Sequence, residues 1–323
     1  MIETQLKDLA IGAEDVRAAA DRIRPLAHRT PVMTSSGFDA ECGVLSFFKC
    51  ENLQRGGAFK IRGASNLILS LPESSLARGV VAYSSGNHAQ ATAIAARHVG
   101  AQSTIVMPED APRSKIEATR ARGARIVTYN RFTGSREAVA ASILKESGAT
   151  LVPPFDHPMI IAGQGTAALE LLEEIGPVDA LITPVGGGGL LAGCATIAKQ
   201  LQPAIRVFGA EPEKANDTFL SLQAGERVGI SHPETIADGL RTPKPGELTF
   251  PILQKFVEGV ILVSDDELRA TVKFMLSRLK ILVEPSGAAG IAAVLFRKLP
   301  PEIHRVGVVI SGGNVDLEEL ARF

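Results

Sequence analysis

Tryptophan is absent from this chain of 323 residues, and aromatic residues make up only 5% of it. Proteins that bind single-stranded nucleic acid stack the bases on aromatic side chains, so this class of function is not expected. The three cysteines, Cys42, Cys50 and Cys194, are odd in number and have no metal-ligand spacing. They are typical of reduced, buried thiols in a cytoplasmic protein.

The sequence also lacks an excess of one charge and lacks long apolar runs. The formal net charge is −1, with acidic and basic residues mixed throughout, which argues against a nucleic-acid or membrane-surface partner. No apolar run has the length of a membrane-spanning helix, and residues 1–5 lack the basic and apolar blocks of a signal peptide. We therefore expect a cytoplasmic protein that binds neither nucleic acid nor membrane.

Apolar runs alternate with helix-like segments along most of the chain. Residues 80–83, 103–107, 124–129, 180–185, 206–210 and 306–310 are continuous apolar runs, as expected for strands that are covered on both faces. The pattern predicts an α/β protein with two open, mostly parallel twisted sheets and covering helices. The length favours two domains. We predict a large domain (1–70 and 158–323) and a small inserted domain (71–157), with Pro153-Pro154 and His157-Pro158 as the return linker.

Four glycines, Gly186, Gly187, Gly188 and Gly189, follow the predicted strand at 180–185 and precede a helix. Glycines let the backbone approach an anion, and the N-terminus of the following helix adds partial positive charge. A tight turn would need only one or two glycines, so the run favours a site for a phosphate monoester. It has neither the lysine of a nucleotide-binding P-loop nor the spacing of a dinucleotide site.

Polar residues follow three other predicted strands. Residues 84–88 (Ser-Ser-Gly-Asn-His) and residues 311–314 (Ser-Gly-Gly-Asn) each lead into a helix-like segment, where helix capping is the alternative interpretation. Glu211 and Asp217 flank Ala215 after the strand at 206–210. Two carboxylates and a carbonyl can bind a hard cation, although solvated surface acids fit the spacing equally well.

Lys60 lies between Phe59 and Ile61, shortly after the glycine pair Gly56 and Gly57. An apolar environment disfavours the ammonium form and lowers its pKa, which makes the amine a nucleophile or a base. Such a lysine can bind pyridoxal phosphate covalently as a Schiff base. The alternative is a lysine whose stem lies on apolar surface while its head reaches water. The other strand-end loops favour the first interpretation, because together they supply the parts of a cofactor site.

Taken together, these segments resemble the serine/threonine dehydratase and serine racemase family of fold-type II pyridoxal-phosphate enzymes, which have a tryptophan synthase β-like fold. The resemblance covers almost the whole chain, from residues 27–31 to residues 314–317. It rests on motifs that occur in the family's order, at residues 59–64, 84–88, 161–166, 186–189, 235–239 and 311–314.

The resemblance implies roles for individual residues. Lys60 would carry the cofactor and act as the catalytic base, and Ser85 would be the acid or base on the opposite face. The cofactor would contact Phe59, Lys60, Asn87, Gly186, Gly187, Gly188, Gly189, Glu284 and Ser311. The substrate would contact Ser84, Ser85, His88 and Arg136. Glu211, Ala215 (through its carbonyl) and Asp217 would bind Mg²⁺, or Mn²⁺ or Ca²⁺ in its place. A homodimer is the expected assembly.

The sequence departs from the family pattern in two places. Members commonly have Thr-Gly-Ser before Phe-Lys, whereas this chain has Gly56, Gly57 and Ala58 and so lacks two hydroxyls. The chain ends at Phe323, without the C-terminal regulatory domain of biosynthetic threonine dehydratases. Feedback control by isoleucine is therefore not expected.

Three reactions fit these residues. The first is β-elimination from L-threonine or L-serine, which yields a 2-oxo acid and ammonia; a neutral Ser311 at the ring nitrogen favours this outcome over transamination. The second is the same elimination from 3-hydroxyaspartate, whose extra carboxylate would need His88, Arg136 or Arg241. The third is racemisation of serine by Lys60 and Ser85. A non-catalytic pyridoxal-phosphate-binding or metabolite-sensing protein is disfavoured by the presence of Lys60.

Overall fold

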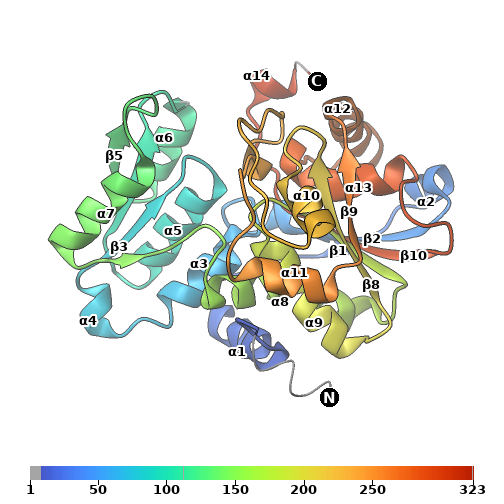
Figure 1. The fold of residues 1–323 in the computed structure, drawn as a ribbon, viewed down its shortest axis with the longest axis horizontal. Helices are drawn as coiled ribbons and strands as arrows, with labels where there is room; N and C mark the ends of the chain where they lie inside the picture. Colours follow the sequence, from blue (N-terminus) through green and yellow to red (C-terminus); the bar gives the residue numbers. More distant parts are fainter. Residues whose placement is uncertain (1–8, 112, 322) are drawn as a thin grey trace.

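The larger of two sheets has six strands in the order β1-β2-β10-β7-β8-β9 (Figure 1). The computed structural model describes residues 9–111, 113–321 and 323. Only the edge strand β1 runs antiparallel to its neighbour, and the remaining strands are parallel. The strands are β1 (Val32–Met33), β2 (Leu45–Cys50), β7 (Ala180–Pro184), β8 (Arg206–Pro212), β9 (Gly259–Val263) and β10 (Arg305–Ile310).

Helices cover both faces of the large sheet, which explains why its strands are apolar on both sides. One face packs against α2 (Ser36–Cys42), α12 (Asp265–Phe274) and α13 (Pro285–Leu295). The other face packs against α1 (Ala13–Ile23), α8 (Pro158–Ile175), α9 (Gly189–Leu201) and α11 (Thr249–Phe256). Shorter elements complete this part: η2 (Glu51–Leu53), α10 (Asp217–Ala224), η3 (Asp238–Leu240), η4 (Met275–Leu279) and α14 (Leu317–Leu320).

The smaller sheet has four parallel strands in the order β5-β4-β3-β6. These are β3 (Val80–Tyr83), β4 (Ser103–Pro108), β5 (Arg125–Tyr129) and β6 (Thr150–Leu151). Helix α5 (Asn87–His98) packs on one face and α7 (Arg136–Ser147) on the other. Two further helices belong to this part, α4 (Glu73–Leu76) and α6 (Arg113–Ala121).

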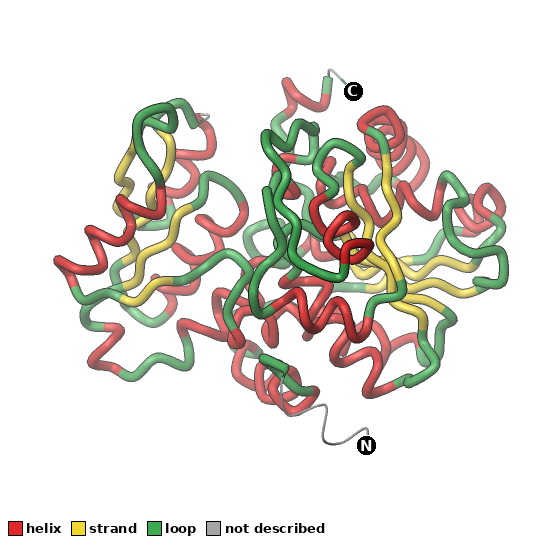
Figure 2. Tube along the Cα trace, in the orientation of Figure 1, coloured by secondary structure: helices red, strands yellow, loops and turns green. Residues whose placement is uncertain are grey.

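Helix α3 (Lys60–Ile68) lies between the two sheets and packs against both α5 and α8. Figure 2 shows long loop segments on the side of the large-sheet part that faces the small sheet. All four strands of the small sheet come from residues 71–157, and we propose these limits for the small domain. Residues 1–70 and 158–323 then form the large domain.

The predicted α/β class and the parallel sheets are confirmed, with strands at each of the six apolar runs. The prediction that His157-Pro158 belongs to a linker is wrong, because this pair begins α8. Proline fits the first turn of a helix, where its missing N–H needs no partner, and the His157 side chain accepts a hydrogen bond from the N–H of Met159 over 3.1 Å.

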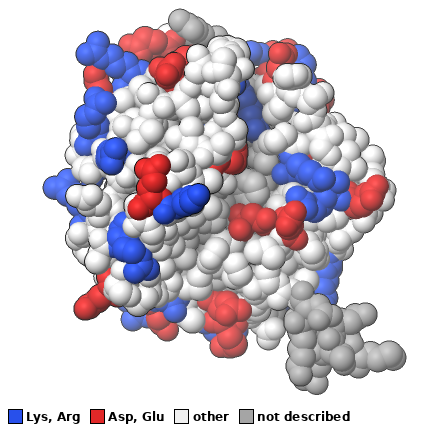
Figure 3. All heavy atoms as spheres, turned by 60° about the vertical axis from the view of Figure 1, so that its left-hand side comes forward, with Lys and Arg blue, Asp and Glu red and all other residues white. Residues whose placement is uncertain are grey.

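The surface carries mixed charges, and the face in Figure 3 shows basic and acidic side chains interspersed. None of the described helices has both the length and the apolar character that crossing a bilayer requires. The prediction about a signal peptide concerns residues 1–5, which lie outside the described residues.

Candidate active site

A cavity of 710 Å³ lies between the two sheets, and both contribute to its walls. It is bordered by residues 84–88 after β3, by residues 186–189 after β7 and by Ser311 after β10. Ligands of parallel sheets bind beyond the carboxyl ends of the strands, and three predicted strand-end loops meet here. We call residues 84–88 the serine loop and residues 186–189 the glycine loop.

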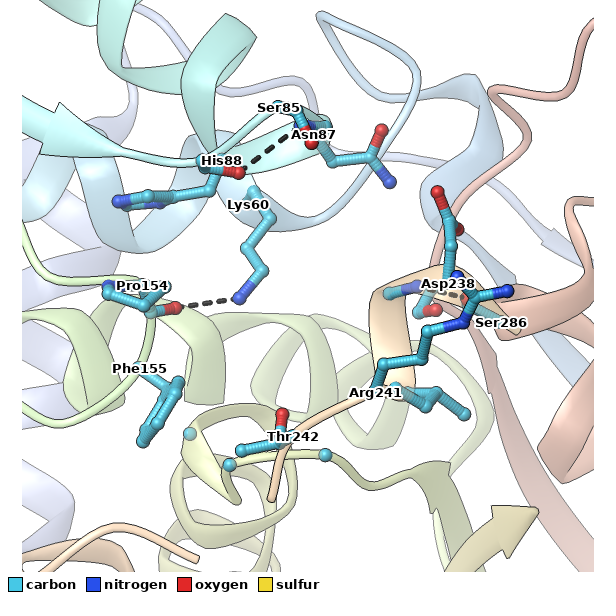
Figure 4. A pocket seen from close by; sticks show the side chains of 18 of the residues that line it. Lys60, Ser85, Asn87, His88, Pro154, Phe155, Asp238, Arg241, Thr242 and Ser286 are labelled. Carbon is cyan, nitrogen blue, oxygen red and sulfur yellow. Dashed lines mark hydrogen bonds between the residues drawn. The ribbon is translucent and has the colours of Figure 1, made fainter. Parts of the chain in front are cut away.

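Lys60 is the first residue of α3 and extends into this cavity (Figure 4). Its Nζ donates a hydrogen bond to the carbonyl oxygen of Pro154 over 2.6 Å and lies 5.0 Å from the centre of the Phe59 ring. Burial lowers the pKa of Lys60 from 10.5 to about 8. A substantial fraction of the amine is therefore neutral near physiological pH and available as a nucleophile.

The segment before Lys60 is held against the loop after β10. The N–H of Phe59 donates to the carbonyl oxygen of Ser311 over 3.0 Å, and Ala58 forms a bridge with Gly312. These contacts place Lys60 and Ser311, 251 positions apart in the chain, on the wall of one cavity. Ser311 is only 3% exposed, which suits a partner for a buried ring nitrogen.

Gly56, one of the two residues where the sequence departs from the family pattern, has a φ angle of +79°, and the next residue, Gly57, has a φ angle of +74°. A side chain is strained in this left-handed region. A Cβ on Gly57 would also lie 2.2 Å from Oδ1 of Asn314, and Asn314 donates its amide to the carbonyl oxygen of Gly56 over 2.7 Å. The asparagine amide thus occupies the space beside this turn.

The glycine loop is tightly surrounded. Gly188 has a φ of +93°, and a Cβ on Gly187 would lie 2.5 Å from the ring of Phe155. A Cβ on Gly186 would lie 3.0 Å from the Thr242 hydroxyl. Helix α9 begins at Gly189, so its N-terminus adds partial positive charge to the loop. A backbone cradle of this kind suits a phosphate group.

Asn87, at the end of the serine loop, is part of a hydrogen-bonded group. Its side-chain amide donates to Oε1 of Glu284 over 2.7 Å and its carbonyl oxygen accepts from the Asn314 amide over 2.9 Å. Oε2 of Glu284 accepts from the backbone N–H of Asn314 over 3.0 Å. Burial, and then the charge of Asp238, raises the pKa of Glu284 to about 8, so this carboxyl is largely protonated at pH 7.

His88 lies in the wall of the cavity but is only 3% exposed. Its Nε2 is 2.8 Å from the carbonyl oxygen of Val152 and so carries the hydrogen. Burial, followed by the nearby charge of Lys60, lowers the pKa of His88 to about 3. The imidazole is neutral and cannot serve as the cation that a second substrate carboxylate would need.

The other predicted substrate contacts also line the cavity. Ser84 and Ser85 lie half-exposed at the end of β3. Arg136 is exposed, lies over the Tyr83 ring with its guanidinium carbon 5.3 Å from the ring centre, and pairs with Glu137 over 2.7 Å. Lys60, Ser84 and Ser85 thus share one cavity with Arg136, which is the most exposed of the predicted substrate contacts.

The predicted cation ligands lie outside this cavity, and Glu211 belongs to strand β8 itself. The side chains of Glu211 and Asp217 are fully buried, so the alternative of solvated surface acids is wrong. Glu211 accepts hydrogen bonds from two backbone N–H groups, whereas neither oxygen of Asp217 has a partner among the described residues. Burial raises the pKa of both carboxyl groups, and the charge of Asp217 raises that of Glu211 further.

Two buried carboxylates, of which Asp217 has unpartnered oxygens, fit a hard cation. No group of three or more His, Cys, Asp or Glu side chains in the described chain could hold a metal ion. A cation here would need backbone oxygen as a further ligand. Ala215, the predicted source of that carbonyl, is also fully buried.

The sequence did not indicate several residues of the cavity. The Pro154 carbonyl that accepts from Lys60 is a backbone atom, which no residue type reveals. Lys115 of α6 and Asp238 of η3 form an ion pair over 2.7 Å. Lys115 and Asp238 are 123 positions apart in the chain, and no sequence pattern shows that their charges pair.

The cavity as a whole fits pyridoxal phosphate. It has a lysine of lowered pKa, a glycine cradle for the phosphate, a buried serine for the ring nitrogen and room for a substrate. The residues that would hold the cofactor follow strands of both sheets. This fit rests on the described side chains and their contacts.

Comparison with known proteins agrees with this fit. Residues 23–312 match the family described as pyridoxal-phosphate dependent enzyme. The chain is 47% identical to L-threo-3-hydroxyaspartate ammonia-lyase of Saccharomyces cerevisiae, over 95% of this chain and 94% of that protein. It is 46% identical to serine racemase of Schizosaccharomyces pombe, over 96% of each.

A solved structure agrees with the fold. Maize serine racemase matches with a TM-score of 0.94 and 44% identity, covering 97% of this chain and 96% of that one. The family match covers the strands of both sheets and the positions of the predicted cofactor contacts. The chain therefore belongs to the family of pyridoxal-phosphate-dependent enzymes.

Proposed function

We propose that this protein is an ammonia-lyase that removes water and then ammonia from a small β-hydroxy amino acid. L-Serine and L-threonine are the simplest substrates of this class. The observation that carries the proposal is the position of Lys60, whose Nζ lies in the cavity that the glycine loop and the serine loop share. The names of the relatives support the reaction class.

Lys60 supplies the proton transfer in this reaction. Pyridoxal phosphate, when bound, provides the electron sink that makes a Cα–H bond acidic. The neutral amine of Lys60 would take the proton from Cα of the substrate, and its lowered pKa matches this task. The carbonyl of Pro154 can hold the resulting ammonium through a hydrogen bond.

The serine loop binds the other end of the substrate. Its hydroxyls and the N-terminus of α5 offer donors to the α-carboxylate. Ser311 would contact the ring nitrogen as a neutral group, which would favour prompt loss of the β-hydroxyl over transamination. Asn87, which Glu284 and Asn314 hold in place, would contact the ring hydroxyl. These roles follow the assignments that the resemblance implies.

The test is release of ammonia and a 2-oxo acid from L-serine and L-threonine by the cofactor-loaded protein, with Lys60→Ala as the comparison. We expect equal amounts of the two products from the natural chain. Borohydride reduction should fix the cofactor to Lys60 and to no other lysine. A protein that retains the cofactor but releases neither product contradicts the proposal.

A second candidate substrate is 3-hydroxyaspartate, and one observation favours it. Arg241 lines the cavity, donates to the carbonyl oxygen of Thr235 and has no carboxylate partner among the described residues. Its positive charge is available for a second substrate carboxylate, unlike that of Arg136, which pairs with Glu137. The ammonia-lyase of Saccharomyces cerevisiae carries this substrate in its name.

Arg241→Ala tests that assignment, with Arg136→Ala as the matched control. If Arg241 binds the second carboxylate, its loss lowers kcat/KM for 3-hydroxyaspartate about 10- to 100-fold and leaves kcat/KM for serine within about twofold. Equal losses on both substrates would contradict it. A larger selective loss in Arg136→Ala would transfer the role to Arg136.

We further propose that Glu211, Asp217 and the Ala215 carbonyl bind Mg²⁺ or a similar divalent cation. The unpartnered oxygens of Asp217 support this proposal. We also propose a cytoplasmic homodimer, for which the support is the family resemblance. Size measurement in solution tests the dimer directly.

A further inference from the structure

The carbonyl groups of the glycine loop are held by two buried threonines. The carbonyl oxygen of Gly187 accepts from the Thr249 hydroxyl over 2.7 Å and from the N–H of Gly246 over 3.2 Å. The carbonyl oxygen of Gly186 accepts from the Thr218 hydroxyl over 3.3 Å. Both threonines are 0% exposed and neither lines the cavity. These carbonyl oxygens therefore point away from the cavity.

This arrangement fixes the direction of the next two N–H groups. In a trans peptide the carbonyl and the following N–H point in opposite directions, and the described chain has no cis peptide. Holding the carbonyls of Gly186 and Gly187 outward turns the N–H groups of Gly187 and Gly188 toward the cavity. Across the described residues, neither N–H has a backbone acceptor. Two donors are thus directed at the position where a phosphate would bind.

Asp156 holds Thr249 in place. Its carboxylate accepts hydrogen bonds from the N–H groups of Glu247 (2.8 Å), Leu248 (2.9 Å) and Thr249 (3.3 Å). These N–H groups lie at the start of α11, where they have no partner within the helix and where a negative charge is favourable. The end of α11 that carries the threonine is therefore fixed to the wall of the cavity.

We propose that Thr249 is a positioning residue for the phosphate of the cofactor, with Asp156 fixing α11 behind it. Thr218 acts in the same way on the neighbouring peptide. The inference rests on the cofactor site described above and concerns its phosphate end. Thr249 does not line the cavity and would act only through the Gly187 peptide.

The test compares pyridoxal 5′-phosphate with pyridoxal, which lacks the phosphate, in titrations of the cofactor-free protein followed by absorbance. Removing the hydroxyl in Thr249→Val should weaken binding of pyridoxal 5′-phosphate roughly tenfold. Binding of pyridoxal should stay within about twofold. Thr249→Ser keeps a hydroxyl and should restore most of the loss.

Thr196→Val is the matched control. Thr196 is also buried and also donates to a backbone carbonyl, that of Ala192, but within α9 rather than to the loop. The control should leave both affinities unchanged. Equal weakening of both ligands in Thr249→Val would show a general packing role and overturn the proposal, as would an unchanged affinity for pyridoxal 5′-phosphate.

Asp156→Asn provides a second variant if Thr249→Val does not fold. An amide accepts fewer hydrogen bonds than a carboxylate at the start of α11. We therefore expect the affinity for pyridoxal 5′-phosphate to fall selectively, but by only about threefold. Loss of both affinities, or of neither, would again overturn the proposal. No substrate enters these titrations, so failure of the proposed reaction would leave their outcome intact.

Discussion

Nζ of Lys60 and the carbonyl oxygen of Pro154 are joined by a hydrogen bond of 2.6 Å. The contact connects the first turn of α3 with the segment that leaves the small sheet after β6. It keeps the amine at the wall of the cavity and offers an acceptor to its charged form. The reactive lysine is therefore positioned by the segment that follows the small sheet as well as by its own helix.

The pKa of Lys60 predicts how cofactor attachment depends on pH. Because burial lowers this pKa to about 8, the neutral amine increases about tenfold from pH 6 to pH 7 and levels off above pH 8. The rate of attachment of pyridoxal phosphate to the cofactor-free protein should follow that curve. Stopped-flow absorbance measures it. A rate that keeps rising up to pH 10 would show that the pKa of Lys60 is close to its ordinary value of 10.5 and would contradict this prediction.

The same shift has a consequence for stability. A lysine whose folded-state pKa is lowered costs free energy below pH 8, and this cost disappears as pH rises from about 8 to 10.5. We expect the cofactor-free variant Lys60→Met to have a higher Tm than the natural chain at pH 7, with the difference shrinking toward pH 10.5. Calorimetry of both proteins checks the sign.

The close contact between Gly187 and Phe155 predicts the effect of a methyl group on the glycine loop. Gly187→Ala places a Cβ 2.5 Å from the ring and must displace the loop or the ring. We expect affinity for pyridoxal phosphate to fall roughly 10- to 100-fold, since backbone donors lose their alignment. Gly259→Ala is the control, because a Cβ there meets nothing within 4 Å. Unchanged affinity in Gly187→Ala would contradict a phosphate role for the loop.

Replacement of Ser85 should affect racemisation and elimination differently. Elimination needs a base on one face of Cα, whereas racemisation needs a second group on the opposite face, for which Ser85 is the candidate. Ser85→Ala should lower any formation of D-serine from L-serine roughly 10²- to 10⁴-fold while reducing elimination much less. Chiral chromatography and ammonia release, measured on one sample, give both rates. Parallel loss of both would point to a role in binding.

The buried pair Glu211 and Asp217 predicts a response to divalent cations. Neither oxygen of Asp217 has a partner among the described residues, so a cation should relieve repulsion between the two carboxylates. We expect Mg²⁺ to raise the Tm of the natural chain and to have little effect on Asp217→Asn. In the absence of Mg²⁺, the variant should be the more stable protein. A Tm that does not respond to Mg²⁺, Mn²⁺ or Ca²⁺ would refute the site.

The sequence predicted those parts of the molecule that depend on local pattern. Continuous apolar runs revealed the buried strands, and the polar or glycine-rich residues directly after them revealed the loops that meet at the cavity. Strands β1 and β6 have two residues each and were missed, because so short a pattern carries no periodicity. The six predicted runs also leave out β2, which contains Ser46 and Lys49, and β9, although β9 is apolar.

The contacts that support the site could not be predicted in the same way. Thr249 binds the carbonyl of Gly187 from 62 positions away, and nothing in a single threonine distinguishes it from one that caps a helix. The neutral state of His88 follows from its burial, which depends on how α5 packs against the strand ends. Only the three-dimensional structure shows these relationships.

The central claim is that Lys60 catalyses β-elimination from a β-hydroxy amino acid. The most direct measurement is ammonia and 2-oxo acid release by the cofactor-loaded protein from L-serine, L-threonine and the isomers of 3-hydroxyaspartate. We expect equal amounts of both products from at least one of these substrates, and a rate about 10²- to 10⁴-fold lower in Lys60→Ala. Release of neither product from any of these substrates, by protein shown to hold its cofactor on Lys60, would contradict it.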